Sequence, residues 1–189
     1  MVSYFWRRVT IVYQSFRGSN VNRSLNLKNL SIAALSTLTL GLSSFQPAFA
    51  GTPDPRIKAA LDAQEIKYEL SKDGNYKVTL PVGSGRTQLV LINSAVSKLT
   101  NMEIREVTSV AYKGSGVFPP EMAVKLMKDS SNRTIGAWEL LANDTTSLAV
   151  FNAKVPSDLP AKSLVETILR VAVVADTVEK DLTNGKDDF

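Results

Sequence analysis

The chain has 189 residues and contains neither cysteine nor histidine. Without cysteine it forms no disulfide and has no thiol nucleophile. Without histidine it lacks the usual general base near neutral pH and the commonest metal ligand. Serine–histidine–aspartate and cysteine–histidine catalytic sites are therefore excluded.

The first fifty residues have the composition of a secretory signal peptide. They hold no acidic residue and five basic ones: Arg7, Arg8, Arg17, Arg23 and Lys28. An apolar stretch from Leu30 to about Leu42 follows, and Ala48-Phe49-Ala50 matches the small-residue pattern of a cleavage site. This stretch is shorter than the roughly 20 residues that cross a bilayer. We therefore expect cleavage after Ala50 and export to the periplasm or the extracellular space; an uncleaved membrane anchor is the alternative.

Cleavage after Ala50 changes the charge of the protein. The full chain has 22 basic and 18 acidic residues, and all 18 acidic residues lie after Ala50 together with 17 of the basic ones. Residues 51–189 therefore carry a formal charge of −1, and their basic residues form no run. We expect no nucleic-acid partner, because such partners select clustered positive charge. We also expect a single domain, with no stable membrane span after cleavage.

The beginning of this domain predicts a short helix over residues 54–63. Asp54 is a suitable helix cap, and Pro55 fits the first helical turn. Ile57, Ala60 and Leu61 then share one face of the helix. A short extended segment is expected over residues 66–70.

Three strands are predicted next. The Asp73-Gly74 pair is typical of a hairpin turn, and alternation of apolar and polar residues over 76–80 predicts a half-buried strand. Residues 87–93 predict a strand that is apolar on both faces, and residues 102–112 predict a longer strand. The run of residues 83–86 lacks the Gly-Lys-Ser/Thr ending of a phosphate loop, so we interpret it as a turn.

The second half predicts a helix, a hairpin and a final helix. The helix begins at Pro119-Pro120 and runs to about residue 129, with Met122, Leu126 and Met127 inward. Strands over 135–141 and 148–155 form the hairpin. The final helix begins near Pro160, capped by Ser157 or Asp158, and ends at Asn184-Gly185. Its apolar stripe has helical spacing: Leu164, Ile168, Val171, Ala175, Val178 and Leu182. Residues 184–189 are expected to be a frayed tail.

This order predicts an α+β domain with three helices and a mostly antiparallel sheet of five to six strands. Strands 87–93 and 135–141 are apolar on both sides, so both faces of the sheet need a cover. The cover is either a remaining helix or another subunit. The second alternative predicts a homodimer.

Several runs in this domain together resemble the YbjN-like domain family. They are residues 60–68, 73–80, 85–90, 103–107, 111–112, 136–139 and 185–189. The last run is similar to the ends of exported bacterial members, notably cyanobacterial ones. The resemblance implies a fold similar to type III secretion chaperones, small α+β domains that commonly dimerise and bind polypeptide segments. The family is labelled a sensory-transduction regulator with a poorly defined role, and the resemblance implies no catalytic residue.

A few residues are candidates for binding a partner. Glu106 shares a strand face with Ile104 and Thr108, so it is expected to point inward, with Arg86 as its partner. That pair is either a structural salt bridge or an anchor for a ligand. Trp138 is either core or an exposed aromatic platform. Met122 and Leu126 are either core or an adaptable apolar surface.

Two functions are consistent with these residues. The first is a non-enzymatic, chaperone-like or regulatory domain that binds a protein or peptide, with no cofactor and no metal. The second is an envelope hydrolase that uses serine with lysine, or carboxylates. Glu103 and Glu106 lie on opposite faces of a strand and cannot form a catalytic pair. The sequence has neither an S-x-x-K nor a G-x-S-x-G motif, so we favour the first function.

Overall fold

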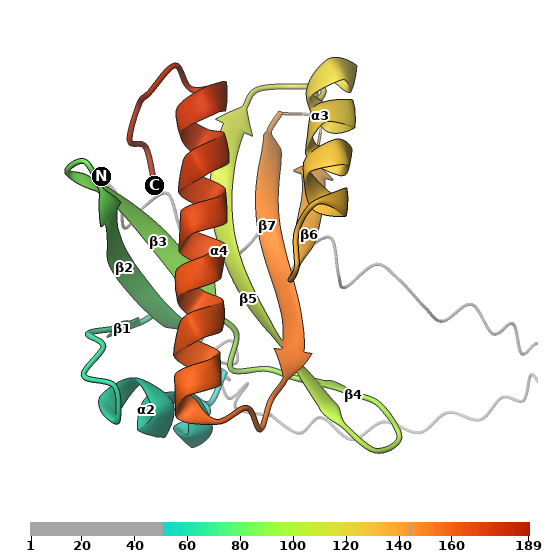
Figure 1. Ribbon diagram of the computed structural model, residues 1–189. Helices are drawn as coiled ribbons and strands as arrows, with labels where there is room; N and C mark the ends of the chain where they lie inside the picture. Colours follow the sequence, from blue (N-terminus) through green and yellow to red (C-terminus); the bar gives the residue numbers. More distant parts are fainter. Residues whose placement is uncertain (1–50, 144) are drawn as a thin grey trace, which may run out of the picture. The chain divides into compact units, whose positions relative to one another are not determined.

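The computed structural model describes residues 51–143 and 145–189. The expected signal peptide, residues 1–50, lies outside the described part. The described residues form an α+β domain with three helices and one antiparallel sheet (Figure 1). The predicted fold class is confirmed.

The sheet has seven strands, and every pair is antiparallel. They are β1 (Glu69–Leu70), β2 (Tyr76–Gly83), β3 (Arg86–Ile92), β4 (Ser97–Lys98), β5 (Glu103–Gly114), β6 (Ala137–Ala142) and β7 (Ser147–Pro156). Their order across the sheet is β1-β2-β3-β5-β7-β6, and β4 pairs with β5. The prediction missed β4, because a two-residue strand is too short to show an alternating pattern.

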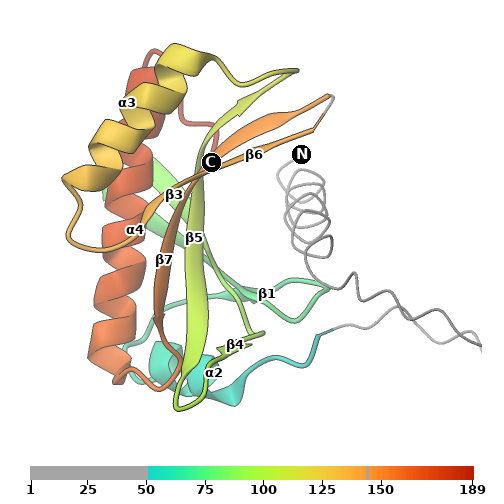
Figure 2. The ribbon, with the colours of Figure 1, turned by 90° about the vertical axis from the view of Figure 1, so that its right-hand side faces the viewer.

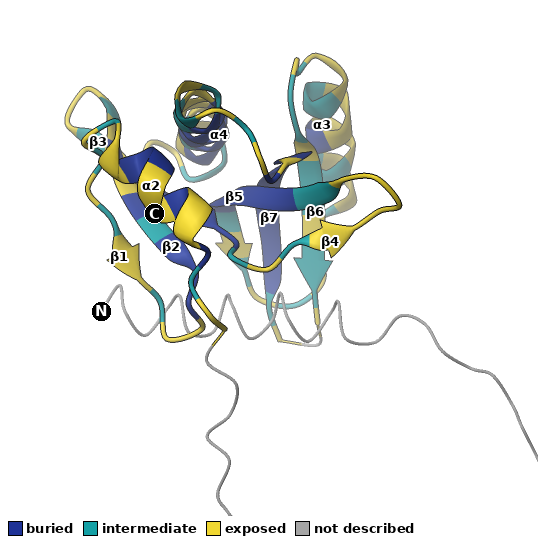
Figure 3. Ribbon diagram, turned by 90° about the horizontal axis from the view of Figure 1, so that it is seen from below, coloured by how far each residue is buried: buried dark blue, intermediate teal, exposed yellow. Residues whose placement is uncertain are grey.

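All three helices lie on one face of the sheet (Figures 2 and 3). The longest, α4 (Ala161–Leu182), crosses the middle of the sheet and contacts β2, β3, β5 and β7. Helix α3 (Pro120–Ser131) packs against β6, and α2 (Pro55–Asp62) packs against α4. None of the helices in the described part combines the length and apolarity needed to cross a membrane.

Among residues 51–143 and 145–189, two apolar clusters form the core between this face and the helices. The larger cluster joins Ile57 and Leu61 of α2 to Ile168 of α4 across Val78 and Phe151 of the sheet. The smaller cluster lies under α3 and the end of α4, and its buried members are Ala111, Phe118, Leu126, Ala149, Ala175 and Val178. Trp138 packs against both clusters and so connects them.

The beginning of α2 follows its predicted local chemistry. Asp54 caps the helix, because its Oδ1 accepts a hydrogen bond of 2.8 Å from the backbone N–H of Arg56. Pro55 occupies the first helical position, as expected.

The predicted stripe of α4 is confirmed, but its predicted cap is wrong. Five of the six stripe residues are buried, and Leu182 is partly buried. Pro160 is the residue before the helix and makes no side-chain cap bond. Ser157, which was expected as a cap, instead accepts a bond of 3.0 Å from Arg56 Nη1 and donates one of 3.1 Å to Glu103 Oε2. The helix ends at Leu182 with Thr183 as its C-cap, directly before the predicted stop at Asn184 and Gly185, which both have positive φ.

Candidate partner-binding face

The face of the sheet opposite the helices is apolar along its middle. Strand register places Leu91 beside Thr108 and Val110 beside Val150. Side chains alternate between the two faces along a strand, so these residues point away from α4. Five apolar side chains from β3, β5 and β7 define what we call the helix-free face: Leu89, Leu91, Val110, Leu148 and Val150.

These five side chains have little exposure. Each is less than a tenth exposed, yet none belongs to the two apolar clusters described above. Within residues 51–143 and 145–189, no helix packs on this side of the sheet (Figure 3). Their low exposure is therefore not due to α2, α3 or α4.

Polar side chains flank the apolar residues on this face. Asn152 Nδ2 donates a hydrogen bond of 2.8 Å to Glu139 Oε1, and Lys154 Nζ lies 3.0 Å from the same oxygen. Glu106 is 6% exposed, but it lies on this face and not on the face that packs against the helices. The helix-free face thus has an apolar middle and hydrogen-bonding groups beside it, a composition typical of protein interfaces.

The expected pairing of Glu106 with Arg86 is wrong. Glu106 shares the helix-free face with Thr108, whereas Arg86 reaches α4 on the opposite side. Strands β3 and β5 pair only from Val90 to Ile92, so Arg86 also lies beyond the paired part. Alternation along β5 could predict the burial of Glu106, but not its partner.

Arg86 instead bonds to α4 and to the last residues of the chain. Its Nε donates to Asp176 Oδ1 at 2.5 Å. Its Nη1 donates to the carbonyl oxygens of Gly185, at 3.0 Å, and of Lys186, at 2.9 Å. The predicted frayed tail is therefore wrong: residues 184–189 are held against the beginning of β3.

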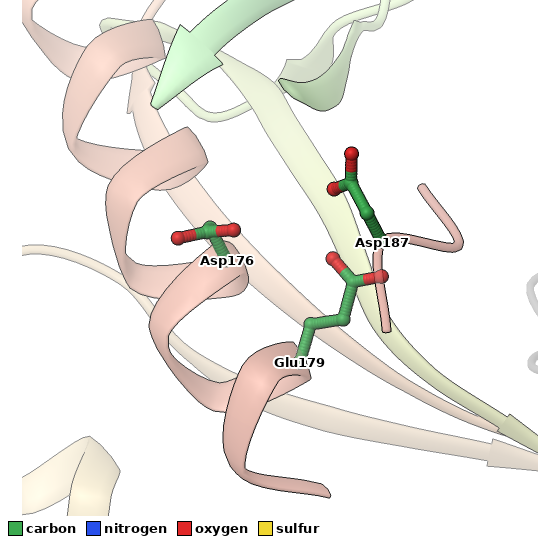
Figure 4. A group of neighbouring side chains, drawn as sticks. All are labelled: Asp176, Glu179 and Asp187. Atoms are coloured by element: carbon green, nitrogen blue, oxygen red, sulfur yellow. The ribbon is translucent and has the colours of Figure 1, made fainter. Parts of the chain in front are cut away.

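Three carboxylates lie close to the Arg86 guanidinium, and Figure 4 shows how these three side chains lie relative to one another. Besides Asp176, they are Glu179, 3.3 Å from Nη2, and Asp187, 3.6 Å from Nη2. Each carboxylate offers an oxygen within 4.8 Å of the others, as in a cation site. The guanidinium already supplies the positive charge among them, so we assign no metal to this group.

Trp138 is partly buried and packs against the core, so it does not form an exposed platform. Its ring packs edge-on against Phe151, with the centroids 5.2 Å apart. Its Nε1 donates to Asp129 Oδ2 at 2.6 Å, and its backbone N–H donates to Ser130 Oγ at 2.9 Å. Trp138 thus fastens α3 to the edge strand β6.

The α3 methionines differ in position. Leu126 is buried, and Met122 packs against the smaller cluster. Met127 is 73% exposed, so the prediction that it points inward is wrong. A helix advances by 3.6 residues per turn, so the residue next to buried Leu126 points about 100° away from it. The core uses Met122 and Leu126, which leaves Met127 as the outward side chain.

A pocket of about 480 Å³ lies at the tip of β4 and β5, lined by polar and apolar residues that include Arg56, Lys98, Met102, Glu103 and Ser157. It places Ser157 Oγ 3.1 Å from Glu103 Oε2. Hydrogen bonds from Arg56 and Ser157 hold the pKa of Glu103 below its usual value. A carboxylate with a lowered pKa is a weak general base, so this contact offers little activation of the serine.

A buried ion pair was missed by the sequence prediction. Arg105 is 1% exposed, and its Nη2 lies 2.5 Å from Asp54 Oδ2. Burial opposes ionisation of Asp54, but hydrogen bonds from Arg56 and Arg105 outweigh it and hold its pKa well below the usual value. Arg105 shares a strand face with Val107, so alternation along the strand could have predicted its burial.

Searches of protein-family models and of curated proteins find no match to this chain. The resemblance to the YbjN-like family therefore rests on the sequence runs alone.

Proposed function

We propose that residues 51–189 act outside the cytoplasm as a non-catalytic, YbjN-like binding domain that holds a polypeptide on the helix-free face. One observation carries this proposal: the sheet is apolar on both sides, and all three described helices lie on one side. No described helix covers Leu91, Val110 and Val150 on this side of the sheet. An apolar surface of this kind in an otherwise soluble domain marks an interaction site.

The shape and charge of the helix-free face favour a polypeptide over other ligands. Small molecules bind in concave pockets, whereas this surface is the broad side of a sheet. Nucleic acids select clustered basic residues, and this domain has a formal charge of −1. A polypeptide supplies apolar side chains for Leu91 and Val150 together with backbone groups for Thr108 and Asn152. A second copy of this domain is one such polypeptide.

The binding proposal predicts the effect of polar substitutions on this face. The double variant Val110→Thr, Val150→Thr keeps β-branched side chains but places two hydroxyls in the apolar middle. We expect it to weaken partner binding at least about tenfold, because each buried hydroxyl without a partner costs roughly 1–3 kcal/mol. Self-association is measured by light scattering, and binding of a permanently unfolded polypeptide by fluorescence anisotropy, both on the exported protein.

Val173→Thr is the matched control, because Val173 is half exposed on α4, away from this face. We expect it to change neither measurement. Self-association that is lost in the double variant identifies a second copy as the partner, and peptide binding that is lost identifies another polypeptide. A wild-type monomer that binds no polypeptide at about 100 μM, some 5 kcal/mol of binding free energy, contradicts the proposal.

The export part of the proposal has its own test. Mass spectrometry of the exported protein is expected to give Gly51 as the first residue, because Ala48-Phe49-Ala50 matches a cleavage site. Export should also leave the protein in the soluble envelope or extracellular fraction. Recovery of the intact chain in the membrane fraction favours the alternative of an uncleaved anchor.

A further inference from the structure

The last six residues of the chain are fastened to the domain through a small set of polar contacts. Arg86 of β3 donates to two of their carbonyl oxygens, as described above. The backbone N–H of Thr87 donates to Asp187 Oδ2 at 3.3 Å, and the backbone N–H of Asp188 donates to Glu179 Oε1 at 2.5 Å. We call residues 184–189 the tail segment. Its position depends on charged groups of β3 and α4 and on no apolar cluster of the described residues.

Glu179 is the unusual member of this set. Its side chain has no exposed surface, and its Oε2 has no hydrogen-bond partner, although Arg86 Nη2 lies 3.3 Å away. The charged groups that face it are Arg86 from β3, Asp176 from its own helix and Asp187 from the tail segment. With Glu179 ionised, the three carboxylates carry three negative charges against the single positive charge of Arg86. Protonation of Glu179 reduces this excess of negative charge from two to one.

We propose that the tail segment is a pH-dependent latch, which is closed on β3 and α4 while Glu179 is protonated and opens as Glu179 ionises. The closed latch covers Glu179 and places Asp187 beside it, and both effects penalise the ionised form; the Asp188 N–H bond to Glu179 Oε1 favours the ionised form but does not outweigh burial. Opening gives Glu179 access to water and removes Asp187. It also frees Arg86 Nη1 and the Thr87 N–H, the two donors that the tail segment occupies in the closed state. The latch is independent of the helix-free face.

The direction of the pH effect follows from Glu179. Burial, with a smaller contribution from Asp187, raises its pKa from 4.5 to about 7 in the closed state. A carboxyl group whose pKa is raised on closing favours the closed state at low pH. The closed state is therefore most stable below about pH 4.5, weakens as the pH rises toward 7, and changes little above that. If the opened state has the usual pKa, opening becomes up to about thirty-fold more favourable between pH 5.5 and 8.5.

Nuclear magnetic resonance of the full chain tests the latch. The amide signals of Asp188 and Phe189 are followed from pH 5 to 9, together with the carboxyl carbon of Glu179. We expect the Glu179 carboxyl to titrate near pH 7, and amide-exchange protection in the tail segment to fall up to thirty-fold over the same interval. Glu179→Gln mimics the protonated form and is expected to stay closed at every pH.

Glu166→Gln is the matched control, since Glu166 is exposed on the same helix, and we expect it to retain the wild-type pH dependence. Titration of wild-type Glu179 below about pH 5 would overturn the proposal. So would tail protection that is constant from pH 5.5 to 8.5, or an unchanged pH dependence in Glu179→Gln. The two wild-type measurements decide the question even where Glu179→Gln does not fold.

Discussion

Replacing Arg105 with methionine is expected to lower the free energy of unfolding by about 3 kcal/mol. Arg105 is almost fully buried, and it bonds to Asp54 and to the carbonyl oxygen of Asn93. Methionine fills a similar volume but leaves Asp54, itself 8% exposed, with Arg56 as its remaining ionic partner. Removing one member of a buried ion pair typically costs 3–5 kcal/mol. Urea denaturation at pH 7 measures the change.

The matched control is Arg170→Met. Arg170 is exposed, 3.8 Å from exposed Glu166, and a pair of this kind contributes at most about 1 kcal/mol. We expect a change of less than about 0.5 kcal/mol in this variant. Equal effects of the two substitutions would show that the Arg105–Asp54 pair is not a stabilising contact.

The same pair predicts a loss of stability in acid. The pKa of Asp54 is held well below its usual value in the folded protein. The ionised Asp54 therefore makes its full contribution to the free energy of unfolding above about pH 4. The contribution is lost as the pH falls further and Asp54 becomes protonated. We expect wild type and Arg105→Met to differ less at pH 3 than at pH 7, and urea denaturation at both values measures this.

The local elements were predictable because their signals are local. Alternation of apolar and polar residues identifies β2, and the four-and-three spacing from Leu164 to Val178 identifies α4. The Asp73-Gly74 turn and the Asn184-Gly185 helix end each depend on a glycine with positive φ. The sequence analysis missed β4, because a strand of two residues is too short to show alternation. It misplaced Met127, because successive residues of a helix point about 100° apart and only Leu126 of the two faces the core.

The charged contacts were harder to predict because they join distant parts of the chain. Arg86 meets Asp176, ninety residues later, only because α4 crosses β3. Arg105 meets Asp54 because α2 begins beside the first residues of β5. A strand that is buried on both faces, as most of β5 is, gives no sequence signal for which of its charged residues pairs with which element.

The candidate face was predictable in its composition but not in its position. The apolar residues of 87–93 indicate that both sides of the sheet need a cover, and they leave open whether a helix or another subunit supplies it. Whether a helix covers the second face depends on the side of the sheet on which each helix packs. Because α2, α3 and α4 all pack on one side, the helix-free face becomes the candidate.

The first residues of the domain provide a second large prediction, for Gly74→Ala. Gly74 has a φ of +74°, and a Cβ there would lie 1.8 Å from the carbonyl oxygen of Gly51. The carbonyl oxygen of Gly74 also accepts a bond of 2.6 Å from Ser94 Oγ, which in turn accepts from the backbone N–H of Asp54. The Asp73-Gly74 turn therefore packs against the segment that begins at Gly51 and is joined to it through Ser94. We expect a loss of about 3 kcal/mol, from the left-handed backbone and the clash together.

Gly85→Ala separates these two causes. Gly85 has the same φ of +74°, but nothing lies within 4 Å of the Cβ position. Gly85→Ala should lower the free energy of unfolding only by the cost of a left-handed backbone at alanine, about 1 kcal/mol. Urea denaturation of both variants measures how much more Gly74→Ala loses. If both variants lose the same amount, Gly51 is not packed on the turn in solution. A difference of about 2 kcal/mol would mean that the fold includes the residue directly after the expected cleavage site, so that cleavage even a few residues later would destabilise the domain.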